Sequence, residues 1–218
     1  MPHAGRGVIA RPGNALMVTM APGTAERGLA SAHPFGARRR DHAPVRRHLF
    51  LLRHAKSSWD DPALPDHDRP LAPRGEKAVR RLREHLRQIG AHPDLVICSS
   101  ARRTTETLAG IRQALPKDAE ISIEQDVYLA DADTLLGCLR RIDPHVRSVL
   151  LVGHNPGTED LAVSLVGTGA AEPRALLAER FPTAALAHLT FDVSWADLAP
   201  GTARLVGFFV PRPPRPST

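Results

Sequence analysis

Three apolar runs in the sequence each lead into side chains that can bind an anion or attack phosphorus. The run "LFLLR" ends at Arg53 and is followed by His54, and "VLLVG" is followed by His154. Between them, "DLVICSS" leads into Arg102 and Arg103. Arginine offers a rigid fork of N–H donors that matches phosphate oxygens, and a neutral imidazole is a nucleophile. Two histidines and several arginines in one crevice repel each other without an anion, so the pattern predicts a phosphate site.

The segments that must position these residues alternate between strands and helices. Apolar runs predict strands at 48–53, 94–100, 119–125 and 148–155, and two late strands that suit an antiparallel pair at 184–193 and 203–210. Helical patterns occupy 73–89, 102–115, 132–142 and 158–166. This α/β alternation predicts a three-layer α/β/α sandwich with a mainly parallel central sheet. Because ligands bind beyond the carboxyl ends of such strands, we expect the histidines and arginines to meet there.

The sequence contains no motif for a metal or a nucleotide cofactor. No P-loop, HExxH motif or acidic cluster with metal-ligand spacing occurs, so we expect no metal and no cofactor. Cys98 and Cys138 are predicted to be buried free thiols in a reducing compartment. No apolar stretch reaches the roughly 18 to 20 residues of a membrane helix. We therefore expect a cytoplasmic protein without membrane contact.

The net charge of +6 is concentrated at the two ends of the chain. Residues 1–47 hold eight arginines and two acidic residues, and they are rich in proline, glycine and alanine. We predict a disordered basic extension at 1–47, a catalytic domain at 48–210 and a disordered tail at 211–218. Aromatic residues make up 4% of the chain and none interleaves with the arginine run, so no nucleic acid partner is expected. The translation start (Met1, Met17 or Met20) and the oligomeric state stay open.

Five stretches resemble the histidine phosphatase superfamily, which has the phosphoglycerate mutase-like fold. "LLRHAKSSWD" resembles its Arg-His-Gly motif, and "SSARRTTET" is similar to its Ser-x-x-x-Arg-x-x-x-Thr segment. "VLLVGHNPG" resembles its second-histidine motif. "DRPLAPRG" and "FPTAAL" are similar to the SixA-type branch, which dephosphorylates phosphohistidine. The order of the motifs agrees over nearly the whole predicted domain.

The resemblance implies a role for each matching residue. His54 would be the nucleophile that forms a phosphohistidine intermediate, and Arg53, Arg103 and His154 would complete the catalytic phosphate pocket. Ser57 would also bind substrate. Arg102 is an alternative to Arg103, but the motif spacing favours Arg103.

Two departures from the family pattern bear on the site. Ala55 stands where glycine is usual, and Asp60 stands where related mutases often have an asparagine that contacts phosphate. We expect Asp60 to point away from the site or to be neutral. Asp131 and Asp133 are the candidates for a general acid, although Asp133 equally suits the start of a helix.

The resemblance and the weak acid candidates together favour one function. An imidazole leaving group is far less basic than an alkoxide and needs less protonation. The sequence therefore predicts a metal-independent phosphatase that hydrolyses phosphohistidine, on a protein substrate. A small-molecule phosphomonoesterase or mutase, acting on a small phosphate substrate, is the second hypothesis. A phosphate-binding module without turnover is the third.

Overall fold

The apolar run that precedes His54 becomes a central strand of a sheet. The structure is a computed structural model that describes residues 45–211, and its first strand, β1, spans Arg47–Arg53. Successive side chains of β1 point to opposite faces of the sheet and are buried on both: Leu49, Phe50, Leu51 and Leu52. A strand that is apolar on both sides requires cover on both sides.

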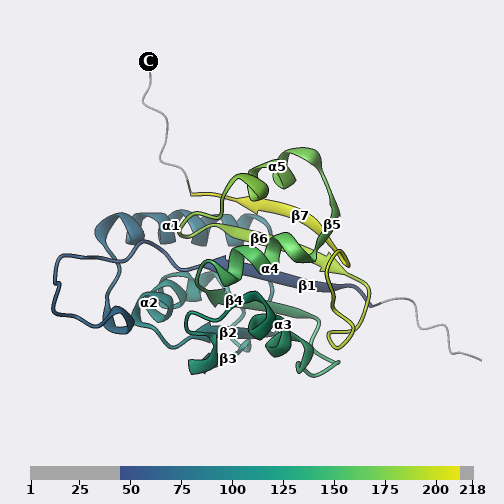
Figure 1. Ribbon diagram of the computed structural model, residues 1–218, viewed down its shortest axis with the longest axis horizontal. Helices are drawn as coiled ribbons and strands as arrows, with labels where there is room; N and C mark the ends of the chain where they lie inside the picture. The colour runs from purple at the N-terminus through teal and green to yellow at the C-terminus, as the bar shows by residue number, and fades with distance from the viewer. Residues whose placement is uncertain (1–44, 212–218) are drawn as a thin grey trace, which may run out of the picture. The chain divides into compact units, whose positions relative to one another are not determined.

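The described residues form a seven-stranded sheet in the order β3-β2-β4-β1-β6-β7-β5 (Figure 1). The other strands are β2 (Leu95–Ser99), β3 (Glu120–Glu124), β4 (Ser148–Gly153), β5 (Val166–Gly169), β6 (Leu186–Phe191) and β7 (Ala203–Phe209). β6 is antiparallel to its neighbours β1 and β7, whereas the remaining neighbouring pairs are parallel. The sheet is therefore mainly parallel, and the late strands pair as predicted.

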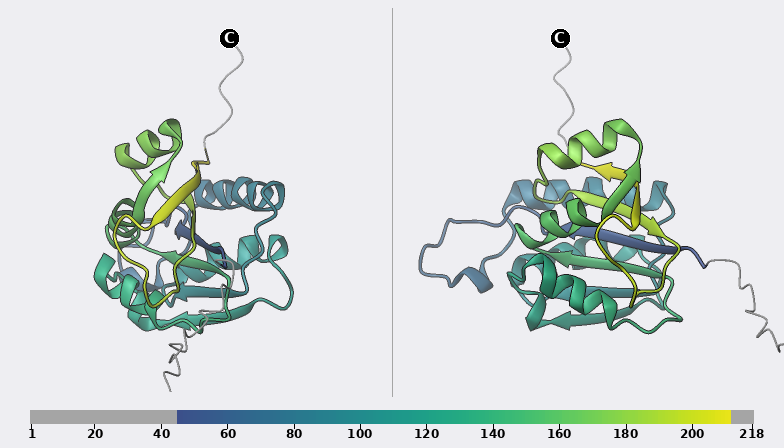
Figure 2. Two further views of the ribbon diagram at one scale, coloured as in Figure 1. Left: turned by 90° about the vertical axis from the view of Figure 1, so that its right-hand side faces the viewer. Right: turned by 45° about the vertical axis from the view of Figure 1, so that its right-hand side comes forward.

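Helices cover both faces of this sheet (Figures 1 and 2). They are α1 (Pro73–Gln88), α2 (Arg102–Ile111), α3 (Ala132–Arg140), α4 (Gly157–Leu165) and α5 (Ala171–Glu179). On one face, Val79 of α1 and Ile111 of α2 join the apolar cluster that contains Leu52. On the other face, α3, α4 and α5 contribute to a second cluster around Leu51. This arrangement confirms the predicted three-layer α/β/α sandwich.

The sequence analysis did not predict β5 or α5, and Cys138 is more exposed than predicted. β5 contains two glycines and α5 has a proline in its first turn, so neither carries a clear periodic pattern. The prediction that both cysteines are buried is wrong for Cys138, which is only half-buried on α3 because it borders an open surface cavity. Cys98, on a strand covered on both faces, is fully buried.

The predicted extension and tail lie almost wholly outside the described residues. Of the extension, residues 45–47 are described, and Arg47 is already the first residue of β1. Of the predicted tail, only Pro211 is described. Among residues 45–211, no helix combines the length and the apolar character that crossing a bilayer demands.

A long loop, residues 54–72, joins β1 to α1 and projects from the body of the fold (Figures 1 and 2). Its base is closed by two backbone hydrogen bonds, one from Ser58 N–H to the Pro70 carbonyl and one from Ala72 N–H to the Lys56 carbonyl, both 2.8 Å. A Cβ on Gly75 would lie 2.3 Å from the Lys56 carbonyl oxygen, so only glycine lets α1 approach this closely. The loop includes the short 3-10 helix η1 (Asp66–Asp68), which contacts α2.

Candidate active site

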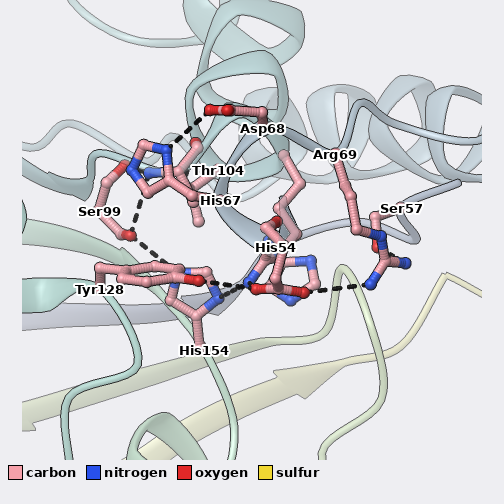
Figure 3. Close-up of polar contacts among 12 residues, drawn as sticks. His54, Ser57, His67, Asp68, Arg69, Ser99, Thr104, Tyr128 and His154 are labelled. Atoms are coloured by element: carbon pink, nitrogen blue, oxygen red, sulfur yellow. Dashed lines mark hydrogen bonds and ion pairs between the residues drawn. The ribbon is translucent and has the colours of Figure 1, made fainter. Parts of the chain in front are cut away.

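The carboxyl ends of three parallel strands lie side by side, because β2, β4 and β1 are direct neighbours in the sheet. Ser99 is the last residue of β2, His54 follows β1 and His154 follows β4. The two imidazole rings are tilted against each other with their centroids 5.0 Å apart (Figure 3). The topology therefore brings both predicted histidines to one place.

A cavity of about 330 Å³ lies over these strand ends. The described residues give it four cationic side chains and one carboxylate, namely Arg53, Lys56, Arg69, Arg103 and Asp66. The rest of its lining consists of His54, Ser57, Trp59, Leu129, His154, Asn155 and Thr183. Because the cations outnumber the carboxylate, the cavity favours an anionic ligand.

His54 is held in one tautomer by its own neighbour. Its Nδ1 lies 2.8 Å from the Ala55 carbonyl oxygen, which can only accept, so Nδ1 carries the hydrogen and Nε2 keeps its lone pair. Burial is the main cause that lowers the pKa of His54 to about 4, so the ring is neutral at pH 7. The Ala55 N–H in turn donates to Thr107 Oγ1 at 3.0 Å, which fixes the backbone that orients the ring.

His154 is held in the opposite tautomer. Arg103 Nη2 lies 3.2 Å from Nδ1 of the ring and can only donate, so Nδ1 accepts. Nε2 then carries the hydrogen and donates to Ser99 Oγ at 2.7 Å (Figure 3). Burial, with added repulsion from His54 and Arg103, lowers the pKa of His154 to about 3. Both histidines are therefore neutral at pH 7.

The spacing of Ser99, Arg103 and Thr107 has a structural explanation. Arg103 and Thr107 lie one turn apart on α2 and share a face, so both point toward the loop after β1. Ser99 directs His154, Arg103 reaches into the cavity, and Thr107 anchors Ala55. The three residues thus connect the ends of β1, β2 and β4.

The arginines of the site differ in what they bind. Arg53 Nη1 donates to the Phe181 carbonyl at 2.8 Å, and its buried Nε–H has no acceptor among the described residues. Arg69 is 5% exposed and lies beneath Trp59, with its guanidinium carbon 3.1 Å from the centre of that ring. Arg103, 4% exposed, binds Asp66. Buried guanidinium groups stay charged and require an anion nearby.

Asp66 supplies the carboxylate of the cavity. Its Oδ2 accepts from Arg103 Nη2 and from the Tyr128 hydroxyl, each at 2.8 Å, and its Oδ1 accepts from Arg69 Nη1 at 3.1 Å. Partial burial opposes ionisation, but these hydrogen bonds and the charges of both arginines outweigh it and lower the pKa of Asp66. Asp66 is therefore an ionised carboxylate within the cationic cavity.

Comparisons with known proteins agree with this geometry. Residues 49–133 match the sequence model of the histidine phosphatase superfamily (branch 1). A solved structure of a candidate phosphohistidine phosphatase SixA from Nakamurella multipartitia is 30% identical, with a TM-score of 0.67, over 76% of this chain and 96% of that one. The chain belongs to the histidine phosphatase superfamily. It is a phosphatase of the SixA type, and its predicted phosphoglycerate mutase-like fold is confirmed.

Two further relatives of this phosphatase cover it to a similar extent. A candidate SixA from Agrobacterium tumefaciens is 30% identical, with a TM-score of 0.65, over 76% of this chain and 98% of that one. An uncharacterized protein of Mycobacterium tuberculosis is 41% identical over 166 residues, which are 74% of this chain and all of the relative. The aligned region is thus close to a complete protein in each relative.

The phosphatase fold gathers most of the residues that the sequence singled out. Arg53, His54, Ser57, Arg103 and His154 all line the cavity. Arg102 does not, because it lies on the exposed side of α2 and pairs with Glu106 Oε1 at 2.7 Å. Of the two neighbouring arginines, the structure therefore places Arg103 at the site.

The predicted acid candidates lie outside the cavity. Asp131 caps the N-terminus of α3, where its Oδ1 accepts from the Thr134 N–H at 2.8 Å. This hydrogen bond lowers the pKa of Asp131, which makes it a poor proton donor. Asp133 is an exposed residue in the first turn of α3. Asp60 is exposed on the loop and also stays outside the cavity, in line with the expectation that it points away.

Sequence reasoning missed Asp66 and Tyr128. Asp66 belongs to a loop with several aspartates, and Tyr128 follows the 3-10 helix η3 (Gln125–Val127). Neither shows a local signal of function, and their contact joins positions 62 residues apart. Within residues 45–211, no group of three or more histidine, cysteine or acidic side chains is placed to hold a metal ion.

Acidification is expected to destabilise the phosphatase. The pKa values of His54 and His154 are about 4 and about 3, below the ordinary 6.5. Between these values and 6.5 the unfolded chain binds protons that the folded chain does not, so the free energy of unfolding falls as the pH falls. Urea denaturation should give a lower midpoint at pH 5 than at pH 7. His54→Asn should lose less stability over that interval, and an equal loss would contradict this assignment.

Ser99→Ala is expected to reduce kcat by disturbing His154. Removing a partner that orients a functional histidine costs about 10- to 100-fold, judged from metal-bound histidines. The hydroxyl of Ser99 accepts the Nε2–H of His154 at 2.7 Å, so its loss frees the ring to change tautomer. Activity and the nitrogen NMR shifts of His154 should change together. Unchanged shifts with lower activity would refute the tautomer argument.

Proposed function

We propose that this phosphatase hydrolyses phosphohistidine on a protein through a covalent intermediate on His54. The observation that carries the proposal is the tautomer of His54, whose Nδ1–H is fixed on the Ala55 carbonyl and whose Nε2 lone pair is free at pH 7. An unprotonated nitrogen in a cationic cavity is the group required to attack phosphorus. The two SixA relatives, named for phosphohistidine phosphatase activity, support the same substrate class.

The reaction takes place in two displacements. First, the Nε2 lone pair of His54 forms a bond to phosphorus while the P–N bond of the substrate breaks and its electron pair goes to the departing ring nitrogen. Second, water attacks the phosphorus of phospho-His54, the Nε2–P bond returns its electrons to Nε2, and the water proton passes to a phosphate oxygen or to solvent. Arg53 and Arg103 neutralise charge on the equatorial oxygens during both steps, and His154 lies beside them in the cavity lining, where it can donate an N–H to a phosphate oxygen.

The proton balance of the first step favours phosphohistidine over a phosphate ester. A phosphohistidine that is protonated on its other ring nitrogen releases neutral imidazole without an added proton, whereas an ester releases an alkoxide that requires an acid. The carboxylate of this cavity, Asp66, is ionised in the free site because its pKa is lowered. The described cavity therefore supplies the cations and the nucleophile for phosphoramidate cleavage, but no protonated carboxyl group for ester cleavage.

The mouth of the cavity supports a protein substrate. Trp59 and Leu129 border it and are 70% and 54% exposed, so in the described part of the chain the mouth lies open rather than beneath a cap domain. A side chain that protrudes from another protein can enter such an opening.

A direct assay separates phosphohistidine from ester substrates. The protein is incubated with a radiolabelled histidine-phosphorylated protein and, separately, with p-nitrophenyl phosphate, and label transfer is analysed after an alkaline quench. We expect faster turnover of the phosphohistidine protein and an acid-labile label on the enzyme. Preference for the ester would favour the small-molecule phosphomonoesterase. Phosphate binding without turnover of either compound would favour a binding module.

A further inference from the structure

Asp66 binds two of the cationic side chains of the cavity, Arg69 and Arg103. Arg103 Nη1 donates to the Asp66 backbone carbonyl at 2.5 Å, and Nη2 donates to the Asp66 Oδ2 at 2.8 Å. Both terminal nitrogens of the buried Arg103 are therefore bound to one residue. An incoming phosphate needs those same N–H donors, because a guanidinium binds oxyanions through paired terminal nitrogens.

The carboxylate is held from several sides but is not enclosed. Arg69 binds its Oδ1, and the Tyr128 hydroxyl binds its Oδ2. Arg69 is itself fixed, since it donates to the Ser58 carbonyl at 2.9 Å and to Ser57 Oγ at 3.1 Å. The side chain of Asp66 nevertheless remains 48% exposed. It can leave Arg103 for water without crossing a packed core.

We propose that the Asp66 carboxylate is an internal competitor for the phosphate position, which a phosphoryl dianion displaces and a monoanion does not. A monoanion carries the same charge as the carboxylate and gains little by replacing it at Arg103. A dianion gains about twice the attraction from Arg53, Arg69 and Arg103 together. Asp66 thereby makes the site select terminal phosphoryl groups against phosphodiesters and carboxylates.

Asp66 also helps to position Arg103 against His154. With Asp66 on Arg103, the Nη2 of Arg103 faces Nδ1 of His154, and His154 acts as an acceptor. When Arg103 turns its donors to a bound dianion, His154 loses this donor and can take a proton to bind a phosphate oxygen. Asp66 thus maintains an arrangement of Arg103 and His154 that a bound phosphoryl group must replace. This inference rests on the proposed phosphate site but not on the identity of the leaving group.

The test measures inorganic phosphate binding by calorimetry at pH 8 and low salt, in wild type, Asp66→Asn and Asp68→Asn. Asparagine keeps the shape of residue 66 without its charge, and a like charge beside a bound anion is strongly unfavourable. We expect Asp66→Asn to bind phosphate about tenfold more tightly and to gain measurable binding of acetate, a monoanion. Asp68 lies in the same 3-10 helix and contacts His67 outside the cavity, so Asp68→Asn should bind within twofold of wild type.

Equal or weaker phosphate binding by Asp66→Asn would overturn the proposal. If that variant fails to fold, Tyr128→Phe provides a second measurement, because it removes one of the donors to Oδ2 and should tighten phosphate binding by a smaller factor. Unchanged or weaker phosphate binding by Tyr128→Phe would then contradict the proposed competition between Asp66 and phosphate. Calorimetry uses no substrate, so a failure to hydrolyse phosphohistidine leaves this result interpretable.

Discussion

His54→Ala is expected to abolish the acid-labile phosphoenzyme and to reduce turnover by at least about 1,000-fold. The Nε2 lone pair of His54 is the proposed nucleophile, whereas both ring nitrogens of the neighbouring His154 are engaged in hydrogen bonds with Ser99 and Arg103. Arg53, Arg103 and His154 remain in the variant, so inorganic phosphate should still bind. Loss of catalysis with retained phosphate binding is the signature of a missing nucleophile, in contrast to a collapsed site.

The matched control is His145→Ala. The side chain of His145 is 96% exposed and contacts Asp143 far from the cavity lining, so its loss should leave the rate within twofold of wild type. Phosphoenzyme is measured after an alkaline quench, and phosphate binding by calorimetry. If His54→Ala still becomes labelled, another residue accepts the phosphoryl group, whether or not that label is stable in acid.

Arg103→Lys is expected to lower kcat/KM by about 100- to 1,000-fold, although it keeps the positive charge. Lysine is a single point of charge, whereas Arg103 presents two terminal nitrogens that bind Asp66 in the free site and would bind paired phosphate oxygens. Arg103 is also 4% exposed, and the shorter lysine side chain would leave the buried Nδ1 of His154 without its donor. The loss should appear in the phosphate dissociation constant and in kcat.

Arg102→Lys provides a control at the adjacent position. Arg102 is on the exposed side of α2, where it pairs with Glu106, and a surface pair of this kind contributes at most about 1 kcal/mol. Its replacement should change kcat/KM by less than twofold. A large effect at residue 102 with a small effect at residue 103 would reverse the assignment of the phosphate-binding arginine.

The sequence by itself determined most of the strands, most of the helices and the residues after the strand ends. Continuous apolar runs are typical of strands buried on both faces; β4 is buried throughout, and β1 is apolar and buried from Leu49 to Leu52. Local patterns also placed Arg53, His54 and His154 at carboxyl ends of parallel strands, where α/β sheets bind ligands. The weak patterns of β5 and α5, with their glycines and proline, left these two elements unpredicted.

Only the tertiary structure decided which side chains contact one another in the cavity. Asp66 binds Arg103, 37 positions away in the sequence, and Tyr128, 62 positions away. Local periodicity does not predict contacts between residues so far apart in the sequence. The acid candidates Asp131 and Asp133 fell outside the cavity because a helix N-terminus uses Asp131 as its cap. The tautomers of the two histidines likewise depend on partners that the fold supplies. Residue type and spacing therefore predict which groups gather, whereas long-range packing decides their partners and their protonation.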